Sequence, residues 1–158
     1  WHSHDFAIVN SDLELMTLSG IQSNDPLAEL PGYVLRRAAN SMMGELAARL
    51  AALDLKISDA SVLLLITGRD DMTSSEIGKV LDIQRANMVP LLNRLESAGL
   101  IARQPLDRKS QAIVLSAEGA EQLAAVRRIT SQFETDLLSR IPSQHRDHLV
   151  PALKALAD

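Results

Sequence analysis

The spacing of apolar residues divides the chain into segments with a helical period and segments with a strand period. Residues 30–53 place apolar side chains at every third or fourth position, which predicts one long amphipathic helix with Pro31 in its first turn. Residues 59–67 include a run that is apolar on every side, which predicts a short buried helix capped by Ser58. Residues 1–26 show little periodicity, and we expect residues 1–29 to form a partly flexible N-terminal extension.

Two short helices joined by a tight turn are predicted in the next part of the chain. Thr73 and Glu76 have the spacing of a capping box, so the first of these helices should begin at Ser74. Residues 82–83 leave room only for a sharp change of direction. The second helix should then continue to about residue 98, because Gly99 is a typical helix stop.

The same periodicity assigns faces to these two helices. Gly78 has no side chain, which should let the second helix cross the first closely. Pro90 removes a backbone hydrogen bond inside the second helix at a cost of ~3 kcal/mol. We favour a helix kinked near Ala86 over one that starts later with Asn87 as its N-cap, because the later start would leave Gln84 and Arg85 in a long turn. We expect Val89, Leu92 and Leu95 to point inward. The residues expected to point largely outward are Gln84, Arg85, Asn87, Met88, Asn93 and Arg94.

Beyond the second helix we interpret residues 100–104 and 110–115 as two β-strands, for which a period of two is expected. The five residues between them predict a hairpin with a charged tip. Arg108 and Lys109 at this tip suit phosphates or the negative potential of a narrow minor groove, although an ordinary solvated turn would carry the same charges. Asp107 either braces these basic side chains or caps the turn.

The exposed residues at the start of the second helix have the chemistry of DNA base readers. In a helix-turn-helix, the N-terminal end of the second helix enters the major groove. Gln84 and Asn87 can each form two hydrogen bonds with adenine, and Arg85 can do so with guanine. A winged helix that docks on another protein would expose Leu, Phe or Tyr at these positions, so the sequence favours DNA over a protein-interaction module.

Two further helices are predicted after the hairpin, one from Ser116 to about residue 139 and one capped by Ser143. The first and last long helices have more apolar surface than one small domain can cover, which favours a dimer interface over packing within the chain alone. The predicted fold is mainly α with a small β-hairpin, a winged helix-turn-helix with long N- and C-terminal dimerisation helices. Within one compact domain, its segments are the extension (1–29), the N-terminal dimerisation helix (30–57), the DNA-binding region (58–115) and the C-terminal dimerisation helices (116–158).

The order of these features resembles the MarR family of winged helix-turn-helix regulators, from about Leu30 to the C-terminus. The most specific parts are the helix end LESAGLI, the hairpin tip DRKS and the return strand into LSAEG. Family members usually carry Asp-x-Arg at the wing, with the Arg in the minor groove and the Asp bracing it. Asp107 matches this pattern, but Lys109 stands at the Arg position, which leaves Arg108 and Lys109 as alternative groove contacts.

The resemblance implies a homodimeric repressor on double-stranded operator DNA. Two recognition helices would meet half-sites of a pseudo-palindrome about one helical turn apart. A small-molecule effector would release the DNA by favouring another spacing of the two helices. The DNA-binding residues expected from the pattern and the resemblance together are Thr73, Ser74, Ser75, Gln84, Arg85, Asn87, Met88, Asn93, Arg94, Asp107, Arg108 and Lys109.

The resemblance also places the effector between the dimerisation helices and the winged region. We expect Arg36, Arg37, Asn40, Met42 and Met43 to line this pocket, because Met fits varied apolar ligands and an Arg pair suits a carboxylate or phosphates. The alternative is that both Met residues belong to the core and both Arg residues to a solvated face. The stretch IQRANMVPL resembles that of regulators of aromatic-acid catabolism, so our hypothesis for the effector is an aromatic acid or its CoA thioester.

The formal net charge of −4 at first argues against a nucleic-acid partner, but its distribution reverses the argument. Residues 83–111 contain five basic and two acidic residues, a local charge of +3, and the other 11 basic and 18 acidic residues carry −7. DNA binding requires a basic face rather than a basic protein. The absence of Cys excludes disulfides, zinc–thiolate sites and thiol-based redox sensing. No apolar run is long enough to cross a bilayer and no secretory signal is visible, so we expect a cytoplasmic protein with no membrane partner.

The sequence does not predict an enzyme. It contains no phosphate loop, dinucleotide fingerprint or metalloprotease helix, so no catalytic residue, bound metal or cofactor is predicted. His145, Asp147 and His148 leave open a metal-responsive regulator of the same fold, but two His at this spacing supply only half a metal site. We attribute the other His pair, His2 and His4, to a flexible terminus.

Overall fold

The computed structural model describes residues 25–157, so the His2–His4 pair and most of the predicted N-terminal extension lie outside the described residues. The chain divides into two compact units, residues 1–41 and 42–158. In the first unit, the described residues form a turn in which the Asp25 carboxylate accepts a hydrogen bond from Leu27 N at 3.0 Å. Helix α2 (Pro31–Ala51) begins there, with Pro31 in its first turn as predicted.

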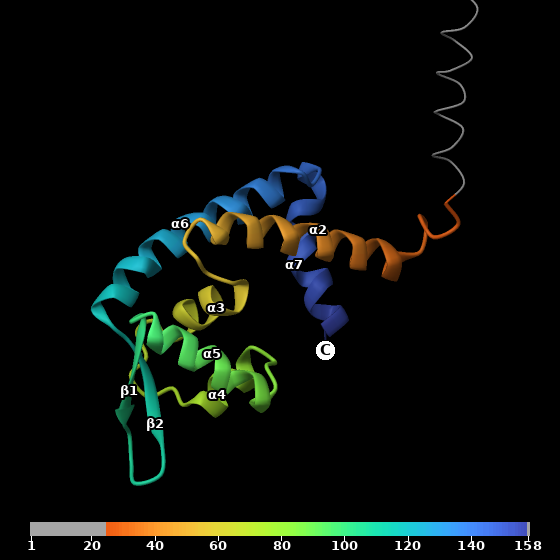
Figure 1. Ribbon diagram of the computed structural model, residues 1–158. Coiled ribbons are helices and arrows are strands. Elements are labelled where there is room, and N and C mark those ends of the chain that lie inside the picture. Colours follow the sequence, from red (N-terminus) through yellow and green to blue (C-terminus); the bar gives the residue numbers. More distant parts are fainter. Residues whose placement is uncertain (1–24, 158) are drawn as a thin grey trace, which may run out of the picture. The chain divides into compact units, whose positions relative to one another are not determined.

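The elements of the second unit follow the predicted order and confirm a mainly helical fold with a two-stranded hairpin (Figure 1). Their positions on the chain agree with the predictions to within a few residues, as is usual at helix ends. After α2 they are α3 (Ile57–Leu65), α4 (Ser74–Val80), α5 (Arg85–Ser97), β1 (Ile101–Pro105), β2 (Gln111–Leu115), α6 (Ala117–Ser139) and α7 (Ser143–Ala157).

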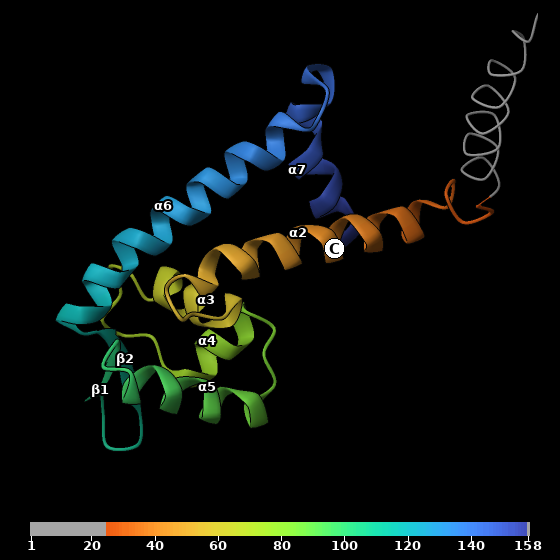
Figure 2. The same cartoon turned by 45° about the horizontal axis from the view of Figure 1, so that its top comes forward.

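Helix α3 is the centre of the hydrophobic core. It lies between α6 and α5 in both views (Figures 1 and 2), and it packs on both. Val62 and Leu63 of α3 are fully buried among apolar side chains of the neighbouring elements. The members of this core contributed by α2, α4, α5, β2 and α6 include Leu50, Ile77, Leu92, Leu95, Ile113, Leu123 and Val126.

The predicted cap of α3 is wrong. Lys56 is the N-cap residue, and Ser58 lies inside the first turn. The Asp59 carboxylate accepts a hydrogen bond from Lys56 N at 2.8 Å, so an acidic side chain three residues on satisfies the free amide. A carboxylate is also favoured there by the partial positive charge of the helix N-terminus. Asp59 is the one charged residue among the buried side chains of the described chain.

The predicted start of α4 is confirmed. Thr73 is the N-cap, its Oγ1 accepts from Glu76 N, and Glu76 Oε2 accepts from Thr73 N at 2.8 Å. Hydrogen bonds donated by the amide and the hydroxyl of Thr73 hold the pKa of the Glu76 carboxyl below its ordinary value. The close crossing at Gly78 is also confirmed, because a Cβ there would lie 3.1 Å from Ile83 O and 3.2 Å from Met88 Cγ.

Helix α5 begins at Arg85 with Gln84 as its N-cap, so the alternative start with Asn87 as N-cap is wrong. The helix continues through Pro90 to Ser97, and the kink near Ala86 remains a prediction. Gly99 follows with φ of 73°, the left-handed conformation expected of a glycine that ends a helix.

The predicted faces of α5 are partly wrong. Met88, expected outside, is 2% exposed, and Val89, expected inside, is 57% exposed. The buried set is Met88, Leu91, Leu92 and Leu95, whose spacings of three and four residues follow one stripe of a helix. Met88 occupies the space left free by the missing side chain of Gly78, which explains why a flexible apolar residue is buried there.

The hairpin, or wing, is antiparallel, with Ile101 opposite Leu115 and Pro105 opposite Gln111. Its return strand is also attached to the start of α4, because Ile113 N donates to Met72 O at 2.8 Å. At the other end of β2, Ser116 caps α6 as predicted and accepts from Gly119 N at 2.8 Å.

A network of ion pairs joins the second half of α2 to α6. Arg49 pairs with Glu45 one turn earlier and with Asp136 of α6 at 2.7 Å, and Arg140 pairs with Glu45 at 2.8 Å. The hydrogen bond from Arg140, together with Arg49, holds the pKa of the Glu45 carboxyl below its ordinary value. A network of this kind restrains the relative position of two helices more than an isolated surface pair does.

Helix α7 has an uncovered apolar face. None of its side chains, all of which lie in the described part of the chain, is buried. Val150, Leu153 and Leu156 are exposed along it, and Ser143 is its first residue rather than its cap. Among the described residues, no helix combines the length and the apolar character that crossing a membrane would require.

Candidate nucleic-acid interface

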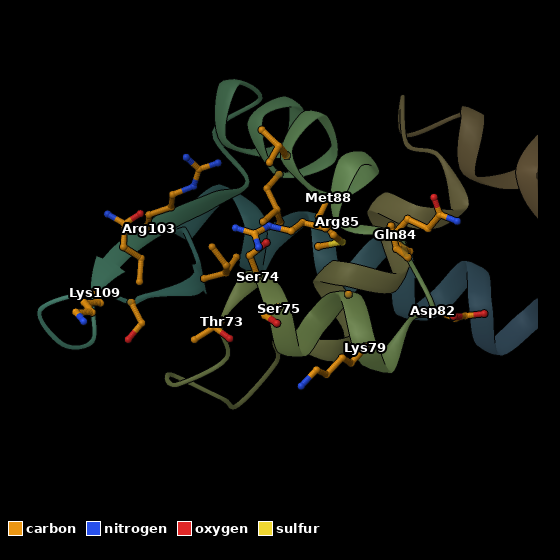
Figure 3. Close-up of a pocket in the computed structure, with 17 residues that line it drawn as sticks. Thr73, Ser74, Ser75, Lys79, Asp82, Gln84, Arg85, Met88, Arg103 and Lys109 are labelled. Carbon is orange, nitrogen blue, oxygen red and sulfur yellow. The ribbon is translucent and has the colours of Figure 1, made fainter.

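A cleft of about 820 Å³ lies where α4, α5 and the wing meet (Figure 3). The start of α4 forms one wall, the start of α5 forms the floor, and β1, β2 and the wing tip form the other wall. The cleft is lined by Thr73, Ser74, Ser75, Gly78, Lys79, Asp82, Ile83, Gln84, Arg85, Met88, Val89, Leu92, Arg103, Lys109, Ser110, Gln111 and Ile113.

The structure brings seven of the twelve predicted DNA-binding residues to this cleft. Gln84 lies with Asp82 at one end, Lys109 lies at the other, and Arg85 lies between them (Figure 3). Both Arg85 and Lys109 are exposed, so their charges are available to a ligand. The seven are Thr73, Ser74, Ser75, Gln84, Arg85, Met88 and Lys109, and those that do not line it are Asn87, Asn93, Arg94, Asp107 and Arg108.

Two of those residues have partners within the protein. Arg94 Nη2 donates to Asp59 Oδ1 at 2.5 Å, and Asp59 is almost fully buried. Asn93 accepts a hydrogen bond from Arg103 Nη2 at 2.6 Å. The helical period predicts the outward face of both residues, but their partners lie on α3 and β1, which residue spacing along α5 does not reveal.

Asp107 caps the turn of the wing. Its Oδ1 accepts from Lys109 N at 2.7 Å and from Ser110 N at 2.8 Å, which decides between the two roles left open by the sequence. Hydrogen bonds from the Ser110 side chain and from these two amides hold the pKa of the Asp107 carboxyl below its ordinary value. The carboxylate therefore orders the backbone that carries Lys109 rather than pairing with the neighbouring basic side chains.

Ten of the seventeen residues that line the cleft were not predicted as DNA-binding residues, and four of these ten bear on its chemistry. Val89 was assigned to the core, yet it is exposed beside Arg85, where an apolar side chain could contact a thymine methyl group. Lys79 lies about one helical turn after the capping box on α4, and its positive charge on that helix was a sequence signal for a contact with DNA phosphates. Arg103 and Gln111 are polar residues of the two strands and lie on the wall formed by the wing.

The predicted effector residues lie along α2, at the end of the first unit and the start of the second. In the first unit, the guanidinium carbons of Arg36 and Arg37 lie 5.2 and 5.8 Å from the centre of the Tyr33 ring, within range of cation–π attraction. Met43 is exposed in the single chain, so the alternative that it is a core residue is wrong for this chain alone. Met42 is half-buried, and Asn40 is exposed.

The histidines of α7 do not assemble a metal site. Within residues 25–157, no three or more His, Cys, Asp or Glu side chains gather closely enough to hold a metal ion, and this includes His145, Asp147 and His148. The described residues therefore give the metal-responsive alternative no support.

Comparison with known proteins agrees with this architecture. The sequence profile of the MarR family matches residues 53–110, which contain α3, α4, α5 and most of the wing. A solved structure of a transcriptional repressor, CouR, bound to a 23-mer DNA duplex is 32% identical, with 84% of this chain and 95% of that chain covered and a TM-score of 0.77. The chain belongs to the MarR family.

Further relatives of this MarR-family chain are regulators as well. A protein of Thauera aromatica, whose name assigns it to transcriptional regulation of the hcr operon, is 27% identical over 97 residues, 60% of this chain. The match spans 58% of the length of that relative. A structure of CouR from Rhodococcus jostii RHA1 bound to p-coumaroyl-CoA shares the fold at 20% identity, with 84% of this chain and 95% of that chain covered and a TM-score of 0.74. This MarR-family protein is a transcriptional regulator.

Proposed function

We propose that this MarR-family chain is a dimeric repressor that binds a pseudo-palindromic operator and releases it when a small molecule binds. The observation that carries the proposal is the cleft between α5 and the wing. Arg85 at the start of α5 and Lys109 at the wing tip both line this cleft, and both side chains are exposed. The first residues of α5 suit base edges in the major groove, and Lys109 at the wing tip suits the narrow minor groove.

The polarity of the cleft supports DNA over a protein partner. The start of α5 exposes Gln84, Arg85 and Asn87, with Val89 as its one large apolar exposed residue. Thr73, Ser74 and Ser75 line the opposite wall, and the hydroxyl groups of Ser74 and Ser75 are of a kind that commonly bonds phosphates. We assign Thr73, Ser74, Ser75, Lys79, Arg85 and Lys109 to contacts with DNA, and we assign Asn93 and Arg94 to contacts within the protein.

The homodimer is supported by the uncovered apolar faces. Val150, Leu153 and Leu156 on α7 would stay in contact with water in a single chain, as would Val34 and Leu35 on α2. A second copy is the proposed cover, because two copies related by a twofold axis would present two α5 helices to two half-sites about one DNA turn apart. Leu156→Glu should convert a dimer to a monomer in sedimentation experiments, and an unchanged sedimentation coefficient would count against this interface.

DNA binding is tested with a duplex that the wild-type protein selects from a random library, measured by fluorescence anisotropy at several salt concentrations. Arg85→Ala should cost ~1–3 kcal/mol and relax sequence preference, and Lys109→Ala should reduce the salt slope by about 1. Arg127→Ala is the matched control, because it removes the same charge from an exposed position on α6 outside the cleft. Failure of the wild type to enrich any sequence would refute the proposed function.

The effector is proposed to be an aromatic acid or its CoA thioester. Arg36 and Arg37, exposed beside Tyr33, form a basic group suited to the phosphates of CoA or to a carboxylate. p-Coumaroyl-CoA should release the selected duplex, CoA alone should not, and Arg36→Ala with Arg37→Ala should raise the concentration required. If neither aromatic acids nor their thioesters change DNA affinity, this effector class is wrong while the DNA-binding proposal stands.

A further inference from the structure

Arg103 on β1 joins the wing to the recognition helix α5. Its Nη2 donates to the side-chain oxygen of Asn93 at 2.6 Å, and its Nη1 lies 3.5 Å from Glu96 Oε2. Asn93 and Glu96 are three residues apart on α5, so they are neighbours on one face of the helix. The planar guanidinium therefore spans most of one helical turn with two of its nitrogens, which a lysine ammonium could not do.

Arg103 also marks the point where β1 leaves the body of the protein. Ile101, two residues earlier, is buried, whereas Gln104 and Pro105 beyond Arg103 are exposed. Within the described residues, Arg103 is the last residue of β1 whose side chain forms a hydrogen bond or an ion pair with α5. The tip extends about 10 Å further at ~3.3 Å per residue, so a tilt of about 10° at Arg103 would move it by roughly 2 Å. A displacement of that size breaks a groove contact.

The charge of Arg103 is already engaged. Its side chain is 30% exposed and faces the Glu96 carboxylate, whereas Lys109 at the tip is exposed. Figure 3 places Arg103 on the wall of the cleft formed by the wing, on the same side as Lys109. These contacts are typical of a residue that holds α5 and the wing in a fixed relative position. They are less typical of a residue that binds a phosphate itself.

We propose that Arg103 is a positioning residue that fixes the angle between the wing and α5, and so matches the wing-tip contact to the base contacts of the helix. The proposal rests on the proposed function, because it takes Lys109 as the wing contact with DNA. It follows that Arg103 acts on DNA affinity through Lys109, and that Asn93 acts through Arg103.

A double-mutant cycle tests this dependence, with the duplex selected by the wild-type protein as the probe. Arg103→Gln and Lys109→Ala should each weaken binding about 5- to 20-fold, and the double variant should be within about 2-fold of Lys109→Ala. The slope of log Kd against log salt concentration should fall by about 1 in either single variant and no further in the double variant. Arg103→Lys, which keeps the charge but loses the fork, should bind as weakly as Arg103→Gln.

Asn93→Ala provides a second route to the same test, because it removes the same hydrogen bond from the opposite side. It should weaken binding to the extent that Arg103→Gln does, and thermal melting should confirm that both variants are folded. Additive losses in the Arg103–Lys109 cycle, with a second drop in the salt slope, would mean that Arg103 contacts DNA directly and would overturn the proposal. So would an Arg103→Gln variant with unchanged affinity. A wild-type protein that selects no duplex would instead remove the proposed function.

Discussion

Gly119→Ala should destabilise this protein although alanine is the better helix former. Gly119 is the third residue of α6, and the main chain of Leu100 passes directly over it at the entrance to the wing. A Cβ on Gly119 would lie 1.9 Å from Leu100 O and 2.9 Å from Leu100 C. Since ordinary contact begins near 3.4 Å, the two segments must separate by about 1.5 Å. The atoms involved are backbone, so no side chain can rotate to make the space.

The sign of the effect follows from the two opposing magnitudes. Forcing atoms into a packed region costs ~1–3 kcal/mol, and more where backbone must move. The gain in helix propensity from Gly to Ala is at most about 1 kcal/mol, and it is smaller near a helix end. The displacement also disturbs the hydrogen bond from Ser116 N to Leu100 O, now 3.2 Å long. We expect a net loss of roughly 1–3 kcal/mol in the free energy of unfolding.

Urea denaturation followed by circular dichroism would measure this loss, at one fixed protein concentration because a dimer's stability depends on it. Gly44→Ala in α2 is the matched control, since a Cβ there meets nothing within 4 Å, and it should be neutral or stabilising by up to ~1 kcal/mol. Gly78→Ala, with its nearest contact at 3.1 Å, should fall between them. If Gly119→Ala were as stable as Gly44→Ala, the steric reasoning would be refuted.

Two further predictions concern Asp59 and Asp107. Asp59→Ala should lower the free energy of unfolding by ~1–3 kcal/mol, because it leaves the Lys56 amide and the Arg94 guanidinium without their acceptor. The Arg94 side chain is 41% exposed, so hydrogen bonds to water offset part of this loss. Urea denaturation would measure the net change. The lowered pKa of Asp107 means that its ionised form stabilises the wing tip above the ordinary pKa of 3.8, and that this stabilisation is lost as pH falls through the lowered value. The amide NMR signals of Lys109 and Ser110 should therefore keep their shifts from pH 7 to 5 and change only below about pH 4, whereas Asp107→Asn should alter them at pH 7.

Most of the secondary structure was determined by signals within a few residues. The Thr73–Glu76 capping box fixed the start of α4, and Ser116 fixed the start of α6, because both interactions close within one helical turn. The charged five-residue tip between two short segments predicted the hairpin, and Gly78 predicted a close helix crossing. The two interactions that define the wing turn also join Asp107 to residues two and three positions away. Local geometry limits such features to few alternatives.

The tertiary structure decided which side chains face which partners. Met88 and Val89 are adjacent and both apolar, and only the packing of α5 against Gly78 shows that the first is buried and the second exposed. Arg94 and Asp59 are 35 residues apart, so no spacing rule could pair them. A long side chain on a known helix face can reach several neighbours, and the fold determines which one is present. For that reason the sequence identified the elements that form the proposed DNA-binding cleft, while the structure separated the residues that line it from those that hold it together.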